Sequence, residues 1–156
     1  MLFNRRHLVF ASLASLLAFA GFARAAEKDH LNLKDGVAAK GYDVVSHVDD
    51  GKAVPGKESL VAQYEGATYR FSSQEHLQKF KTDPGKFIPQ FGGWCATAFA
   101  EDHGKVDVDP RSFKVTDGKL YLFYKGLFGD ARKEWLKDEP GNVVKANQNW
   151  KKTVGG

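Results

Sequence analysis

The chain of 156 residues is poor in cysteine: Cys95 is its only one. A lone cysteine cannot form an internal disulfide, and in an oxidising compartment it would need another reason to be there. Cys95 is therefore a buried thiol, an intermolecular partner, or a functional ligand or nucleophile. These three alternatives stay open at the level of the sequence.

The chain also lacks a hydrophobic run long enough to cross a membrane. The longest run extends from Leu8 to Phe22 and is shorter than the roughly 20 apolar residues that span a bilayer core. It follows Arg5-Arg6 and precedes the small residues of Ala23-Arg24-Ala25, the arrangement of a cleavable signal peptide. We expect cleavage after residue 25, no membrane span thereafter, and a periplasmic location. No cysteine lies near the cleavage point, so a lipoprotein is not expected.

The paired arginines raise the question of the export pathway. Asn4-Arg5-Arg6-His7-Leu8-Val9 resembles the twin-arginine motif, whose pathway carries folded proteins. Asn4 departs from the usual Ser or Thr, and no lysine follows the apolar pair. An ordinary Sec signal that happens to contain two arginines is the alternative.

Beyond the signal, the chain lacks an excess of positive charge. Three of its 23 basic residues (Arg5, Arg6 and Arg24) lie in the first 25 residues, which contain no acidic residue, so 20 basic groups face 19 acidic ones in the remainder. Nucleic-acid binding needs a basic patch to neutralise phosphates. The near balance argues against a nucleic-acid partner.

The remaining length fits one domain. We expect a signal peptide over 1–25, a polar lead-in over 26–35, a single domain over 36–151 and a short tail over 152–156. Alternating apolar residues predict strands at 59–64, 68–71, 112–116 and 119–123. Asp117-Gly118 fits a type I′ hairpin turn. With the helices below, the pattern predicts a small α+β fold of hairpins and short helices around one core.

Four helices are expected. Ser72-Ser73-Gln74-Glu75 looks like a capping box with Ser72 as the cap, opening a helix that stops at Asp83-Pro84. Gly92-Gly93 allows a sharp bend before a buried helix over 94–100. The remaining two helices are predicted at 127–137, where Phe128 and Trp135 belong to an apolar face, and at 143–150 after a break at Pro140-Gly141-Asn142.

Several short motifs in a fixed order resemble the YHS-domain proteins of bacteria, and more narrowly the stand-alone exported subgroup with a GGYCA-like segment. The similarity covers residues 36–151. Its motifs are Gly41-Tyr42-Asp43-Val44-Val45, Tyr69-Arg70-Phe71-Ser72-Ser73, Phe80 with Asp83-Pro84 and Phe87, Pro89-Gln90-Phe91-Gly92-Gly93-Trp94-Cys95-Ala96, Asp117-Gly118-Lys119-Leu120-Tyr121-Leu122, and Ala146-Asn147-Gln148-Asn149-Trp150.

The resemblance implies metal handling, since YHS-type domains occur in heavy-metal transport ATPases and carry cysteines suited to soft cations. This chain departs at each of those cysteine positions: Ser46 stands at the first, Ser72 at the second and His76 at the third. A hydroxyl is a poor ligand for a soft metal, whereas an imidazole is a good one. The thiol site of the family therefore cannot be transferred intact.

Cys95 and His76 are the candidate metal ligands, for copper or another soft transition metal. Cys95 follows the glycine bend and could lie near a helix N-terminus, which would lower its pKa. The competing interpretations are a buried small hydrophobe for Cys95 and a surface histidine for His76. His103 lies eight residues after Cys95, too far along a helix to share an ion with it. His47 stands where an aromatic residue is usual in these proteins, and it is expected to lie on the surface.

The other polar residues suggest no catalytic site. Glu101, Asp102, Asp107 and Asp109 do not match a calcium-loop pattern and are expected to form a solvated loop. No serine has the context of a nucleophile elbow. Three functions remain. The first is a metal-binding module without turnover, the second is an accessory scaffold that has lost its metal site and binds a protein partner, and the third is a thiol redox protein using Cys95. The sequence leans away from an enzyme.

Overall fold

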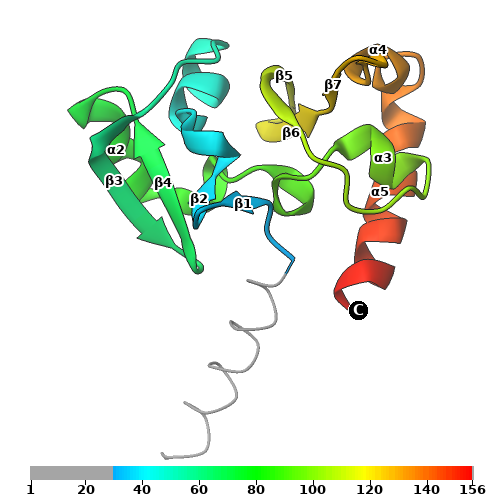
Figure 1. Cartoon of the computed structure of the whole chain (residues 1–156), viewed down its shortest axis with the longest axis horizontal. Coiled ribbons are helices and arrows are strands. Elements are labelled where there is room, and N and C mark those ends of the chain that lie inside the picture. Colours follow the sequence, from blue (N-terminus) through cyan, green and yellow to red (C-terminus); the bar gives the residue numbers. More distant parts are fainter. Residues whose placement is uncertain (1–29, 156) are drawn as a thin grey trace, which may run out of the picture.

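A computed structural model describes residues 30–155, and it is a small α+β domain. The predicted signal peptide and residues 26–29 of the lead-in lie outside the described residues. Figure 1 follows the chain from the β1–β4 sheet with helix α2, on the left, to the β5–β6 hairpin with helices α3, α4 and α5, on the right. Among the described residues, no helix is both long and apolar enough to span a membrane.

The N-terminal part is built on a four-stranded sheet in the order β1-β2-β4-β3. Its long hairpin pairs β3 with β4 in antiparallel fashion through the turn Glu65-Gly66, confirming the two predicted strands. β2 pairs with β4 in parallel. The strands are β1 (Leu33–Lys34), β2 (Val37–Ala38), β3 (Lys57–Tyr64) and β4 (Ala67–Phe71).

Helix α2 (Gln74–Thr82) covers this sheet and ends before Asp83, as predicted. Its apolar face carries Leu77 and Phe80, and Phe80 stacks on Tyr69 and Phe71 of β4. The helix starts one residue later than expected. Ser73 is the N-cap, accepting from the backbone N–H of His76, because both donors of Ser72 bind Asp43 instead.

The middle of the chain contains four short helical turns: η1 (Ala39–Gly41), η2 (Ser46–Asp50), η3 (Pro84–Lys86) and η4 (Gln90–Gly93). A turn follows η2, since Gly51 ends it in a left-handed conformation. The bend at Gly92-Gly93 is present too. A Cβ on Gly92 would lie 2.6 Å from the carbonyl oxygen of His30, so no larger residue fits there without a shift.

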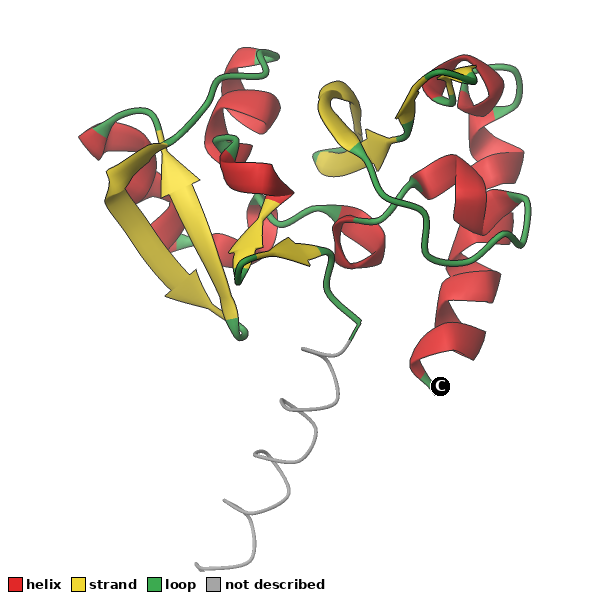
Figure 2. Ribbon diagram, viewed as in Figure 1, coloured by secondary structure: helices red, strands yellow, loops and turns green. Residues whose placement is uncertain are grey.

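The C-terminal part contains the predicted hairpin of β5 (Asp109–Thr116) and β6 (Lys119–Phe123). Its turn residues Asp117 and Gly118 have φ values of 52° and 71°, as a type I′ turn requires. The buried helix around residue 98 is also confirmed as α3 (Ala96–Ala100), with Cys95 as its N-cap residue and all five of its residues buried. Figure 2 shows α3 lying against the long C-terminal helix α5 (Glu139–Val154).

Near the C-terminus, the helix predicted at 127–137 was wrong over most of its length, whereas the helix predicted at 143–150 is confirmed within α5. Residues 125–130 form a second small hairpin, β7 (Lys125–Gly126) and β8 (Gly129–Asp130), and only α4 (Arg132–Trp135) is helical in the range 127–137. Phe128, expected on an apolar face, is 92% exposed at the hairpin tip, whereas Trp135 is fully buried. Gly129, with a φ of 109°, favours a turn over a continuous helix.

Pro140 does not break a helix but begins one. α5 starts at Glu139, and the side chain of Asp138 caps it by accepting from the N–H of Gly141. Proline is favoured in the first turn because its missing N–H would have no helical partner there. Ala146 is the residue of α5 that is buried in the core.

Candidate functional site

The cluster around Asp43 is the most highly connected polar site of the described chain. Asp43 has no exposed surface. Its Oδ1 accepts from the backbone N–H groups of Val45 (2.9 Å) and Ser46 (3.2 Å), which begin the helical turn leading into η2. An aspartate at this position is a typical helix N-cap, because it satisfies N–H groups that lack a partner within the helix.

The second oxygen of Asp43 binds the start of α2. Oδ2 accepts from the backbone N–H of Ser72 at 2.7 Å and from its hydroxyl at 2.6 Å, and it lies 2.7 Å from Nδ1 of His76. One carboxylate therefore joins two helix starts from distant parts of the chain. Sequence reasoning missed Asp43, although its place before two valines and a serine is consistent with a capping residue.

These contacts determine the charge of the carboxylate. Burial by itself would raise the pKa of Asp43, but the hydrogen bonds from Ser72, His76 and Ser46 outweigh burial and lower that pKa. An ionised carboxylate only accepts hydrogen bonds, so the proton between Asp43 and His76 belongs to Nδ1 of the imidazole. In neutral His76, Nε2 then carries the free lone pair.

Nε2 of His76 faces a second carboxylate. It lies 3.6 Å from Oδ2 of Asp50, whose side chain is 42% exposed, while the His76 side chain is 12% exposed. His76 is thus neither a freely exposed histidine nor a buried one. It lies between an inner carboxylate that orients it and an outer one that reaches solvent.

The three positions at which the YHS resemblance expects cysteines all surround Asp43. Ser46 and Ser72 bind its two oxygens through their backbone N–H groups, and His76 binds through Nδ1. Ser46 Oγ is buried and has no hydrogen-bond partner among the described residues. Positions that lie 30 residues apart in the sequence therefore meet at one point of the fold.

Cys95 lies elsewhere. It is 1% exposed, pairs with Leu122 of β6 in a backbone bridge, and begins α3, which packs on α4, α5 and β6. α2, which carries His76, packs on β3, β4 and η3, and Figure 1 shows the two helices on opposite sides of the molecule. The structure does not bring Cys95 and His76 together, so one ion cannot bind both.

The surroundings of Cys95 do not activate the thiol. Burial raises the pKa of Cys95, and backbone hydrogen bonds from Tyr124, Ala98 and Thr97 offset only part of this increase. The expected lowering of the pKa by the α3 N-terminus is therefore outweighed by desolvation. A thiol that is protonated and enclosed is a weak nucleophile and a weak ligand.

The prediction that His47 lies on the surface was wrong. His47 has no exposed surface, packs edge-on against Phe113 with ring centroids 4.6 Å apart, and places its two ring nitrogens 2.9 Å from the Asp43 carbonyl and 2.8 Å from the Pro110 carbonyl. Burial lowers the pKa of His47 by more than these carbonyl contacts raise it. His47 thus links η2 to β5.

The other predicted residues have ordinary roles. His103 is exposed, with Nδ1 3.6 Å from Glu101. In the predicted acidic loop, Asp107 pairs with Lys40 and Asp109 with Arg111. Within residues 30–155, no group of three or more His, Cys, Asp or Glu side chains is arranged to hold a metal ion.

Fold and site together define a small α+β domain with a buried aspartate that orients a histidine near its surface. No protein-family model, curated protein or solved structure matches this chain. The functional argument therefore rests on the residues themselves.

Proposed function

We propose that the exported domain is a metal-binding module that reversibly binds a transition-metal ion, copper by preference, at His76 and Asp50. The observation that carries the proposal is the 2.7 Å hydrogen bond between Nδ1 of His76 and Oδ2 of Asp43. Histidine ligands of metals characteristically donate their second ring N–H to a carboxylate, which orients the ring and raises its basicity. Asp43 would have this supporting role.

The donors available fit a weak and open site. Nε2 of His76 and Oδ2 of Asp50 are 3.6 Å apart, a spacing that two donors each about 2 Å from one ion can have. An imidazole and a carboxylate suit Cu²⁺, which binds such ligands more tightly than the other divalent ions of the first transition row. Water or a partner protein would complete the coordination, so binding would be reversible and without turnover.

Cys95 is the weaker candidate ligand of the two named from the sequence. Its sulfur is enclosed in the core, burial and, to a smaller extent, the Glu101 carboxylate raise its pKa, and in the described part of the chain it belongs to no group of three or more side chains that could hold a metal ion. The same features argue against a thiol redox protein. We therefore assign copper binding to His76 and leave Cys95 in the core.

The test is a titration of the metal-free protein with Cu²⁺, followed by calorimetry and by the nitrogen hyperfine pattern of the copper resonance spectrum. We expect one ion per chain with one imidazole ligand, loss of this site in His76→Ala, and weaker binding in Asp50→Asn. Cys95→Ser should bind as the unaltered protein does.

His103→Ala is the matched control, because His103 also has a carboxylate 3.6 Å away but no buried aspartate behind it. The proposal fails if His76→Ala retains full uptake, if Cys95→Ser abolishes it, or if His103→Ala has the same effect as His76→Ala.

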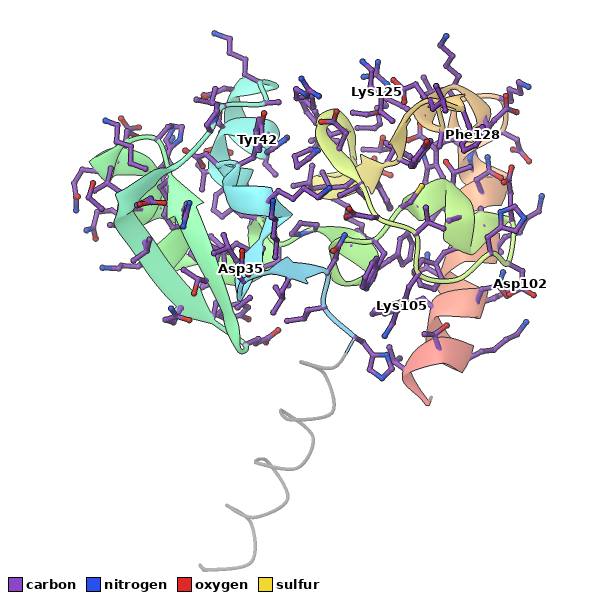
Figure 3. All side chains as sticks on the ribbon, in the orientation of Figure 1. Asp35, Tyr42, Asp102, Lys105, Lys125 and Phe128 are labelled. Atoms are coloured by element: carbon purple, nitrogen blue, oxygen red, sulfur yellow. The ribbon has the colours of Figure 1, made fainter. Side chains whose placement is uncertain are left out.

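An accessory scaffold without a metal is the second candidate, and the hairpin tip favours it. Leu127 and Phe128 are 94% and 92% exposed, and Figure 3 places Phe128 with Lys125 at the outer edge of the C-terminal part. Neighbouring large apolar side chains with this exposure suit an apolar pocket on a protein partner. A photoreactive residue at position 128 should then crosslink one defined partner in the export compartment, whereas the same residue at Lys114 should not.

A further inference from the structure

One cavity of the described chain is lined by none of the residues that contact Asp43. Its volume is about 270 Å³, close to the lower end of small-molecule sites. It opens where the residues before β1, the β3–β4 turn, η4 and α5 meet. Most of its lining is apolar, and its aromatic walls are Tyr69, Phe91 and Trp150.

The cavity has polar groups without protein partners. Tyr69 is 5% exposed, and none of the hydrogen bonds among the described residues uses its hydroxyl. Burial raises the pKa of this hydroxyl, and the Glu65 carboxylate raises it further, so the phenol stays protonated beside that charge. Nδ1 of His30, also in the lining, is buried and has no hydrogen-bond partner within residues 30–155. A buried polar group normally finds a partner, so Nδ1 of His30 points to a ligand, and the Tyr69 hydroxyl is a second polar group in the same lining.

The charge of the lining determines the class of that ligand. Glu65 is its one carboxylate, no lysine or arginine lines the cavity, and among the described residues Glu65 forms no ion pair. A concave site with one unpaired negative charge attracts cations. Aromatic faces attract an ammonium group in the same way, through their quadrupoles.

The walls are also held in place. Trp150 packs against Phe91 and His30 with ring centroids 6.2 Å from each. Gly92 lines the cavity with a left-handed φ of 61°, and a Cβ there would come within 3.1 Å of the Trp150 ring. The hollow is thus defined by close backbone packing and is not a gap that one side chain could readily close.

We propose that this cavity binds a small organic ammonium ion with an apolar body, its charge near Glu65 and Tyr69 and its body between Phe91 and Trp150. The site is independent of the proposed metal site, because the two share no residue.

The experiment compares three probes of one shape: 2-phenylethylammonium, neutral 2-phenylethanol and anionic phenylacetate. Each is titrated into the purified protein while the amide resonances are followed by NMR. We expect shifts at Gly92, Tyr69 and Trp150, with the ammonium probe binding at least about fivefold more tightly than the alcohol and the anion binding weakest.

Glu65→Gln should reduce the preference of the ammonium probe over the alcohol to about equal binding. Glu58→Gln, on strand β3 of the same hairpin but outside the cavity, should leave that preference unchanged. Equal affinity for all three probes in the unaltered protein, shifts outside the cavity, or no shifts at all would each overturn the proposal. A preference that survives Glu65→Gln would overturn the role of Glu65.

Discussion

Nδ1 of His76 lies 2.7 Å from Oδ2 of Asp43, a carboxylate that has no exposed surface. This contact joins the first turn of α2 to the turn that opens η2. It serves both stability and the proposed metal site, because the same carboxylate satisfies backbone N–H groups and orients the imidazole. The two roles can be separated by experiment.

Replacing the carboxylate should destabilise the domain strongly. Asp43→Asn keeps the size but turns one acceptor into a donor that faces the donors of Ser72 or Ser46. Hydrogen bonds to a charged group contribute about 1.5–3 kcal/mol, so we expect the free energy of unfolding to fall by about 3 kcal/mol. Urea denaturation measures this. Asp102→Asn, on an exposed loop, should change it by less than about 0.5 kcal/mol, and a similarly small effect at Asp43 would contradict the assignment.

The stability of the domain should fall as the pH drops below neutrality because of His47. Burial lowers the folded-state pKa of His47 below the value of about 6.5 that it has in the unfolded chain. The unfolded state then binds the proton first, so stability is present above pH about 6.5 and is lost as the pH falls toward the folded-state pKa.

Unfolding free energies measured between pH 7 and pH 5 test this expectation. His47→Gln should reduce the pH dependence, whereas His103→Gln, at an exposed histidine, should not. An unaltered pH dependence in His47→Gln would show that burial does not keep His47 neutral in the folded domain.

Two serines of equal burial should respond in opposite ways to removal of the hydroxyl. Ser46 and Ser112 are both 1% exposed, but Ser46 Oγ has no partner among the described residues while Ser112 Oγ donates to Asp130. Ser112→Ala should cost about 1–2 kcal/mol, since it removes a hydrogen bond to a carboxylate, and Ser46→Ala should be neutral or stabilising by up to about 1 kcal/mol. Thermal unfolding of the two variants measures these changes in stability. A clear loss of stability in Ser46→Ala would mean that the Ser46 hydroxyl has a hydrogen-bond partner.

Cys95 should be almost inert in the folded protein. Its thiol is enclosed and burial raises its pKa, so little thiolate is present or accessible. We expect alkylation by iodoacetamide at pH 8 to be at least about a hundredfold slower in buffer than in denaturant, since reaction must await opening of a fold that is several kcal/mol stable. Mass spectrometry over time measures both rates. Fast labelling in buffer would contradict this expectation and would favour a function of Cys95 as a metal ligand or redox thiol.

Some of the structure follows from short stretches of sequence. The turn at Asp117-Gly118 requires two positive φ values, which these residues tolerate, so the β5–β6 hairpin could be predicted locally. The end of α2 before Pro84 could also be predicted from the local sequence, because proline restricts the backbone conformation of the residue before it. Where local rules competed, prediction failed: Phe128 and Trp135 have helical spacing, yet Gly129 and the buried pocket for Trp135 produce a hairpin and a short helix.

The α+β class, the core hairpins, the one thiol and the few imidazoles that could bind a metal can all be identified from the sequence. Which of these side chains lie together depends on the fold. It separates Cys95 from His76 and brings Asp43 and Asp50 beside His76 instead. It also buries His47. The physical reason is that a contact between residues 43 and 76 depends on how η2 and α2 are positioned in three dimensions, which no spacing along the chain encodes.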